Sequence, residues 1–133
     1  MAEELLRVTN LSVSFRMYQG ALTHTLVAGM HDVNLHLNRG EILAVVGASG
    51  SGKSLLAHAL LGILPYNAVT SGEMIYRGTV LDAARQEELR GRELALIPQS
   101  VTYLDPLMRV GKEVCGLHGS PADMAATFQR LHL

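Results

Sequence analysis

The amino-terminal part of the chain alternates hydrophobic and polar residues, as half-buried β-strands do. Within residues 5–15 three hydrophobic side chains fall on one face of an extended backbone, and serines lie between them: Leu11, Val13 and Phe15. The polar stretch 16–23 contains a glycine and predicts a hairpin connection. The alternation resumes at 26–29 and again at 33–37, which predicts a short return strand and then a further strand.

Three other segments are hydrophobic without alternation. Residues 42–46 and 94–97 are short apolar runs, which predict strands buried on both faces. Residues 54–63 are apolar nearly all round and end near Gly62, with Pro65 beyond, which predicts a buried helix.

Turn and cap residues predict the smaller elements. Residues 73–81 are expected to form a hairpin that turns at Arg77 and Gly78. An aspartate at 82 suits the start of a short helix that ends at Leu89. Ser120 is followed by a proline and, at the third helical position, an acid, so it predicts the start of a helix that runs to the end of the chain.

Composition excludes several classes of protein. The 133 residues are the length of one domain, and 48% hydrophobic content is enough for a core. With 11 basic and 12 acidic residues, the net charge of −1 gives no basic surface for nucleic acid. The single cysteine, Cys115, allows no internal disulfide and is expected to be a small buried apolar residue. The start lacks the basic region of a signal peptide, and no apolar stretch is long enough to span a membrane.

The six histidines show no metal-ligand spacing, so we expect no protein-bound transition metal. His31 and His36 are expected to face solvent along a strand. The charged stretch 85–93 is expected to be a solvated helix face, with contact to a membrane partner as the alternative.

The strongest chemical signal is the sequence GASGSGKS at residues 47–54, a complete G-x-x-x-x-G-K-[ST] phosphate loop between an apolar run and a predicted helix. Glycines allow the backbone to approach a phosphate closely, and the helix N-terminus adds partial positive charge. Lys53 is expected to bridge the β- and γ-phosphates, and the Ser54 hydroxyl to bind Mg²⁺. The predicted ATP-binding residues are therefore Gly47, Ser49, Gly50, Ser51, Gly52, Lys53 and Ser54.

The position of this loop and the segments after it carry a family resemblance. The loop follows 46 residues with strand patterns, and Gln99 comes directly after the second apolar run. The stretch 97–111, which contains IPQS and YLDPLMRVG, resembles the Q-loop region of ATP-binding subunits of ABC transporters that import peptides, opines and nickel. Residues 62–65 and 71–76 are also similar to that group.

The resemblance implies an α/β fold: a P-loop NTPase core with an N-terminal antiparallel β-subdomain and the start of the ABC helical subdomain. It divides residues 1–133 into an antiparallel β portion (1–40), a core from P-loop to Q-loop (41–99) and the start of the helical subdomain (100–133). It also implies that Gln99 is catalytic, approaching Mg²⁺ and the attacking water at the contact with a membrane partner. The metal residues would be Ser54 and Gln99.

The same resemblance calls for an aromatic ring that stacks on adenine. Phe15 fits the spacing best, and Tyr18 is the alternative. A third possibility is that neither ring stacks on adenine. The implied partners are integral membrane permease subunits, a second ATP-binding subunit and, indirectly, a solute-binding protein. The implied place is the cytoplasmic face of the plasma membrane, with no nucleic acid bound.

The sequence departs from the family at its end. It has no LSGGQ signature, no strand ending in Asp-Glu and no switch histidine, and Asp105, which is followed by a proline, is expected to be a loop residue instead. We therefore expect a piece of a longer subunit that binds ATP without hydrolysing it efficiently. The alternatives are a module that only binds nucleotide, a soluble ABC ATPase outside transport, and a P-loop kinase, which the 46 preceding residues disfavour.

Overall fold

The computed structural model describes residues 3–19, 23–100, 104–116 and 119–132. The chain divides into two units, Met1–Leu96 and Ile97–Leu133. The first holds a four-stranded antiparallel sheet and two helices, and the second holds two short helices. None of the helices in the described part is long and apolar enough to cross a membrane. The antiparallel sheet with helices agrees with the predicted α/β class.

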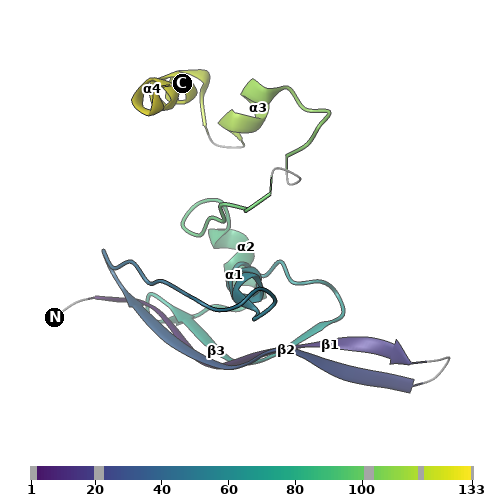
Figure 1. Cartoon of the computed structure of the whole chain (residues 1–133). Coiled ribbons are helices and arrows are strands. Elements are labelled where there is room, and N and C mark those ends of the chain that lie inside the picture. Colours follow the sequence, from purple (N-terminus) through teal and green to yellow (C-terminus); the bar gives the residue numbers. More distant parts are fainter. Residues whose placement is uncertain (1–2, 20–22, 101–103, 117–118, 133) are drawn as a thin grey trace. The chain divides into compact units, whose positions relative to one another are not determined.

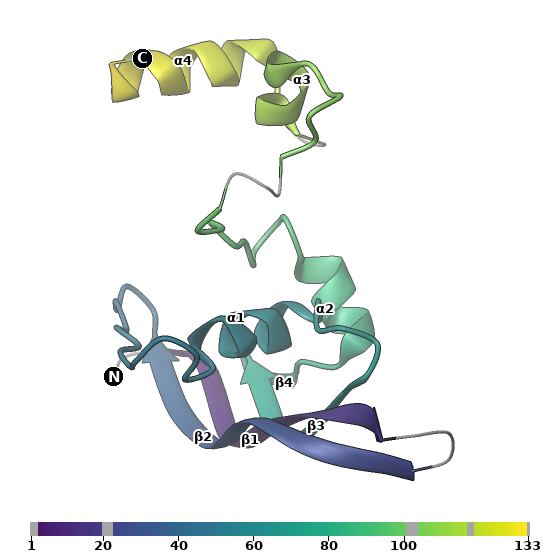
Figure 2. The ribbon, with the colours of Figure 1, turned by 45° about the vertical axis from the view of Figure 1, so that its right-hand side comes forward.

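The sheet has the order β2-β1-β3-β4 (Figures 1 and 2). Its strands are β1 (Glu4–Gln19), β2 (Thr23–Asn38), β3 (Ala68–Tyr76) and β4 (Thr79–Val80).

Strands β1 and β2 form one long hairpin. The predicted hairpin is confirmed, but its bounds of 16–23 are too wide. Arg16 pairs with Leu26 and Tyr18 with His24, so both belong to the ladder and their backbone groups are satisfied there. The predicted gap between 26–29 and 33–37 is wrong, since β2 is continuous.

An irregularity crosses three neighbouring strands at one level of the sheet. Asn10 in β1 and Asp32 in β2 have φ values of 50° and 48°, and Gly72 in β3 has 96°. The pairing registers shift there, between Val8 and Leu11 against β2 and between residues 9 and 12 against β3. Such bulges bend a strand and change which face its side chains occupy. Val8 and Leu11, three residues apart, are consequently both buried in the core.

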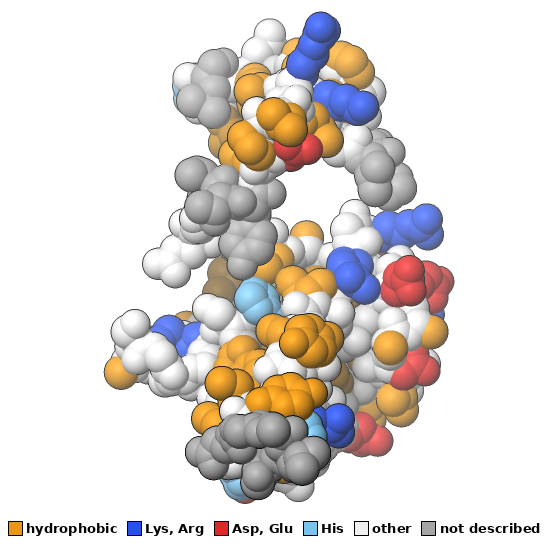
Figure 3. Space-filling model, turned by 90° about the vertical axis from the view of Figure 1, so that its right-hand side faces the viewer, with side chains coloured by type: hydrophobic (Ala, Val, Ile, Leu, Met, Phe, Trp, Pro, Cys, Tyr) orange, Lys and Arg blue, Asp and Glu red, His pale blue; other side chains and the backbone are white. Residues whose placement is uncertain are grey.

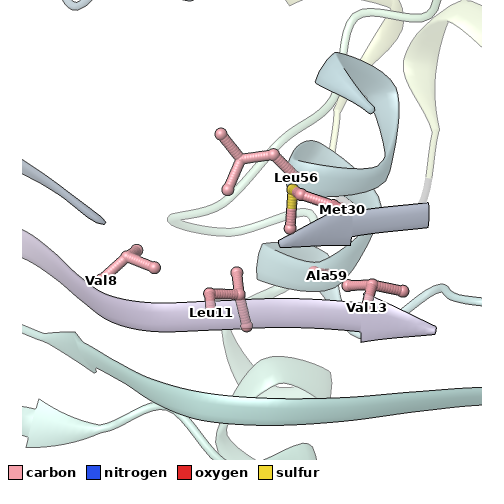
Figure 4. Packing of buried hydrophobic residues seen from close by; sticks show 6 residues of the cluster. All are labelled: Val8, Leu11, Val13, Met30, Leu56 and Ala59. Carbon is pink, nitrogen blue, oxygen red and sulfur yellow. The ribbon is translucent and has the colours of Figure 1, made fainter. Parts of the chain in front are cut away.

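Helix α1 (Lys53–Leu61) lies on one face of this sheet and forms the main core with it (Figures 2 and 4). The predicted helix over 54–63 is thus confirmed, ending slightly earlier, at a left-handed Gly62. The core side chains come from β1, β2 and α1, and Figure 4 shows them between the strands and the helix: Val8, Leu11, Val13, Met30, Leu56 and Ala59.

A second cluster joins α2 (Ala83–Leu89) to the sheet through three buried side chains: Tyr76, Leu81 and Leu89. The hairpin that leads into it turns at Arg77 (φ 48°) and Gly78 (φ 74°), as predicted. Asp82 caps α2, since its Oδ1 accepts the Arg85 N–H at 2.9 Å. The sequence therefore predicted this turn and this cap correctly.

The two apolar runs do not form strands, which corrects a prediction. Residues 42–46 and 94–97 are not assigned to any strand, and the exposed fractions of Ile42, Val46 and Ile97 are 95%, 89% and 95%. A strand buried on both faces needs neighbouring strands, and within the described residues the sheet comprises β1 to β4 alone. These three side chains are among the large hydrophobic residues exposed at the surface of the described part of the chain, and Figure 3 shows hydrophobic side chains on one face.

The second unit contains α3 (Val110–Cys115) and α4 (Pro121–Leu131). The helix start predicted at Ser120 is confirmed: its Oγ accepts the Asp123 N–H at 3.1 Å, and Asp123 Oδ2 accepts the Ser120 N–H at 3.1 Å. Asp105 is a turn residue, as expected, and its Oδ1 accepts the Leu107 N–H at 2.9 Å. The sequence predicts that Cys115 is buried, but it is only half-buried. Residues 101–103 of the predicted Q-loop stretch lie outside the described part.

Candidate functional site

The glycine-rich loop at residues 47–54 leads directly into α1. Its turn is made by two glycines with positive φ, Gly50 at 81° and Gly52 at 90°. Gly50 has open space where a side chain would stand, because nothing lies within 4 Å of its ideal Cβ position. The loop therefore exposes backbone that a bulky anion can approach closely, which is the property expected of a phosphate loop.

Lys53 closes the loop on itself. Its Nζ donates to Gly47 O at 2.7 Å, to Ala48 O at 2.6 Å and to Ser51 Oγ at 3.3 Å. An ammonium group has three donors, so all three are used on the loop. The positive charge is thereby held at the loop, and an incoming phosphate would exchange with these oxygens. Ser54 follows directly and is exposed, so its hydroxyl is open to a metal or phosphate ligand.

The N-terminus of α1 lacks the cap that the next helix has. Gly52 stands at the N-cap, no side chain accepts a hydrogen bond there, and the first turn contains no acidic residue. In α2 the side chain of Asp82 fills this role. First-turn N–H groups without a side-chain acceptor, together with the helix dipole, favour an anion at this position. The residues present thus fit a triphosphate with its Mg²⁺.

The end of the loop lies against strand β2. An ideal Cβ at Gly52 would lie 3.1 Å from Gly29 O and 3.3 Å from Met30 Cβ, so the end of the loop lies against the strand backbone. Sequence reasoning did not single out Gly29. An isolated glycine inside a strand pattern often marks a close backbone approach, and that signal could have found it.

The other end of α1 is closed by internal hydrogen bonds. The N–H groups of Gly62 and Ile63 donate to Ala59 O at 3.2 Å and to His58 O at 3.0 Å. The Gln86 side chain, 6% exposed, adds Nε2 bonds to Ala59 O at 2.8 Å and Leu60 O at 3.3 Å.

Gln86 was also missed, because the stretch 85–93 was interpreted as a solvated charged face. That interpretation is right for Glu87, Glu88 and Arg90, which are exposed. Nothing in the local sequence distinguishes Gln86 from these polar neighbours, since its partners lie on α1.

The two candidate adenine-stacking residues lie on opposite faces of the β1–β2 hairpin. Phe15 packs partly buried against the core that α1 covers. Tyr18 is three residues further along a regular stretch of β1 and so faces the other side. Its side chain is 73% exposed, and its ring lies 4.5 Å from that of His24, centroid to centroid. The orientation favours Phe15 over Tyr18, and the stacking itself stays a prediction.

Gln99 is exposed and belongs to the second unit, whereas the loop belongs to the first. Its role beside Ser54 and Mg²⁺ therefore stays a prediction. The part of the chain that the structure describes contains no group of three or more His, Cys, Asp or Glu side chains able to hold a metal. His31 and His36 are exposed, as predicted, while His118 lies outside the described residues.

Comparison with known proteins adds independent information. Residues 30–133 match the family described as ABC transporter. The chain is 41% identical over 120 residues to the dipeptide transport ATP-binding protein DppD of Lactococcus lactis subsp. cremoris, covering 86% of this chain and 33% of that protein. It is 38% identical over 116 residues to the oligopeptide transport ATP-binding protein OppD of Bacillus subtilis, covering 83% of this chain and 31% of that protein.

The corresponding OppD of Escherichia coli is 38% identical over 117 residues, covering 85% of this chain and 33% of that protein. The chain thus spans about a third of the length of the curated relatives that it matches.

Proposed function

The chain belongs to the ABC transporter family, and on that premise we propose that it is the amino-terminal part of the ATP-binding subunit of an importer for peptides or similar small solutes. The observation that carries the proposal is the loop at 47–54, an exposed glycine turn that ends at an uncapped helix N-terminus with Lys53 folded over it. The similarity to proteins named for dipeptide and oligopeptide transport supports the solute class. An opine or nickel importer is the alternative within the same group.

We propose that the ligand is ATP with Mg²⁺. Lys53 would release Gly47 O and Ala48 O and donate to the β- and γ-phosphates. The N–H groups of the loop and of the first turn of α1 would orient the triphosphate. Ser54 would hold Mg²⁺, which neutralises phosphate charge when bound.

Other residues complete the proposed site. Phe15 would cover one face of the adenine ring, because its face of the hairpin is the one on which α1 packs. Gln99 is proposed to be catalytic and to approach the metal and the attacking water. In this organisation residues 1–40 form the antiparallel β portion, 41–99 the core, and 100–133 the start of a helical subdomain.

The proposed partners are those of an importer subunit: integral membrane permease subunits, a second ATP-binding subunit and, indirectly, a solute-binding protein. The protein would act at the cytoplasmic face of the membrane, where ATP is available. Hydrolysis is proposed for the whole subunit, because phosphoryl transfer also needs a positioned water and further charge stabilisation, which the loop does not supply.

Titration with Mg-ATP, run beside a phosphate-release assay, tests the proposal. Saturable binding with little phosphate release by the 133-residue chain is the expected result. Failure to bind Mg-ATP would overturn the proposal. Rapid ATP hydrolysis by this chain alone would overturn the claim that hydrolysis needs the whole subunit. ADP formation that depends on an added acceptor would indicate a kinase.

A further inference from the structure

Gly29 in β2 lies close to Phe15 and Gly52 of the proposed nucleotide site, and close to Leu55 of α1. Its backbone has an ordinary strand conformation and is not among the glycines with positive φ. A side chain is therefore not excluded by the backbone itself. A Cβ added here would instead meet neighbouring atoms of β1 and α1.

The first two contacts lie where a side chain of Gly29 would stand. An ideal Cβ there would lie 2.7 Å from Phe15 Cε2 and 2.8 Å from Leu55 Cδ1. Both distances are shorter than carbon atoms tolerate without contact strain. The Phe15 and Leu55 atoms are at the ends of movable side chains, whereas Val13 O, 3.3 Å from the same position, belongs to the backbone of β1. A methyl group at Gly29 is therefore expected to displace the Phe15 ring and the tip of Leu55, with a smaller adjustment at Val13 O.

The carbonyl of Gly29 lies beside the end of the phosphate loop. It lies 3.1 Å from the ideal Cβ position of Gly52, the N-cap of α1. Gly29 thus lies directly between the last glycine of the phosphate loop and the ring of Phe15. Leu55, its other neighbour, immediately follows Ser54.

We propose that Gly29 is a positioning residue that sets where the Phe15 ring lies relative to the phosphate loop. The proposal rests on the proposed function, in which the loop holds the triphosphate and Phe15 covers the base. A triphosphate held by the loop fixes how far away the base lies. The Phe15 ring must then lie where the adenine ring falls. Because Gly29 has no side chain, the Phe15 ring can pack against β2 beside the first turn of α1.

The test separates the base from the phosphates. Affinity is measured for Mg-ATP and for magnesium tripolyphosphate, which contains the phosphates without the base. In Gly29→Ala we expect affinity for ATP to fall by about fivefold, the lower range for loss of one base–aromatic stack, while affinity for tripolyphosphate stays within about twofold. Ala28→Val is the matched control, because Ala28 is the neighbouring strand residue, points to the other face and is exposed.

A double-mutant cycle provides the second readout. In a Phe15→Ala background, Gly29→Ala should cause no further loss of ATP affinity, because the ring through which it acts is gone. Equal losses for ATP and tripolyphosphate in Gly29→Ala, or a full additional loss in the Phe15→Ala background, would overturn the inference. If wild-type protein bound neither ligand, the proposed function itself would fail, whereas wild-type binding with an unchanged ratio in Gly29→Ala would defeat this inference alone.

Discussion

Both ends of helix α1 have a glycine at the cap position, yet the polar backbone groups at the two ends are paired differently. Gly52 (φ 90°) stands at the N-cap and Gly62 (φ 64°) at the C-cap. At the C-terminal end, backbone N–H groups and the Gln86 side chain satisfy the last carbonyls. At the N-terminal end, no side chain accepts from the first turn, and Lys53 folds over the adjoining loop.

This difference predicts that one end of the helix mainly affects ligand binding and the other mainly affects stability. A helix end whose polar groups are paired inside the protein contributes to folding, whereas an end without a side-chain cap can offer its N–H groups to a ligand. Substitutions at the N-terminal end should therefore change nucleotide affinity, and substitutions at the C-terminal end should change the free energy of unfolding.

The largest effect is expected at the N-terminal end. Replacing Lys53 by Ala should lower the affinity for Mg-ATP by about 100-fold or more, since two charge-assisted hydrogen bonds to phosphate are lost. The unfolding free energy without nucleotide should change little, because Lys53 Nζ donates to atoms of its own exposed loop. Titration calorimetry measures the affinity. Lys112→Ala is the control, because Lys112 is exposed and is the other of the two lysines in the chain.

At the C-terminal end, Gly62→Ala should reduce the unfolding free energy by about 2–3 kcal/mol. Alanine at this position would have to adopt the left-handed backbone conformation of Gly62, and its Cβ would clash with Gln86 Oε1. Chemical denaturation measures the loss, and ATP affinity should not change. Gly78→Ala is the matched control: its φ of 74° is similar but nothing lies within 4 Å of its Cβ position, so about 1 kcal/mol is expected. Equal losses at the two positions would show that the Gln86 contact contributes nothing.

Gln86→Ala should cost about 1–2 kcal/mol, because it removes the Nε2 hydrogen bonds to Leu60 O and to Ala59 O, although Ala59 O keeps the bond from the Gly62 N–H. Equilibrium denaturation of this variant is compared with that of Glu87→Ala, whose exposed side chain should be worth less than about 0.5 kcal/mol. Indistinguishable midpoints would mean that α2 does not support the end of α1.

The smallest expected effect is on the pH dependence of stability, through Tyr76 in the second hydrophobic cluster. Burial, and then the hydrogen bond from Tyr76 to Glu93 at 3.1 Å, raise the pKa of Tyr76 above its ordinary value. The folded state therefore holds this proton more tightly than the unfolded state. Its contribution to stability is complete below the unfolded pKa of about 10 and is lost as pH rises through the folded value.

Denaturation at pH 8 and pH 11 tests this point. The loss of stability between the two values should be smaller in Tyr76→Phe than in wild type. Tyr66→Phe should behave like wild type, since Tyr66 is 99% exposed. An identical loss in all three proteins would remove Tyr76 from the explanation.

The sequence predicted the parts of this structure that depend on local chemistry. The glycine turn before α1, the helix α1 itself, the turn at Arg77, and the caps at Asp82 and Ser120 are each specified by residues within a few positions of one another. In these segments backbone preference, side-chain caps and the hydrophobic pattern favour the same local structure.

Features that depend on distant neighbours could not be predicted in the same way. The runs 42–46 and 94–97 have strand composition, but composition does not supply a neighbouring strand. The positive φ of Asn10 and the buried side chain of Gln86 likewise follow from other strands and from α1. In the candidate site, the motif identifies the loop residues from local sequence, whereas the proximity of Gly29 O to Gly52 depends on where β2 lies relative to the loop.

One paired measurement tests the central claim, which is that the N-terminal end of α1 binds nucleotide while the C-terminal end stabilises the fold. Mg-ATP affinity and the midpoint of nucleotide-free denaturation are measured for wild type, Lys53→Ala and Gln86→Ala. We predict that Lys53→Ala loses affinity at an unchanged midpoint, and that Gln86→Ala loses stability at an unchanged affinity. Unchanged ATP affinity in Lys53→Ala would contradict the account.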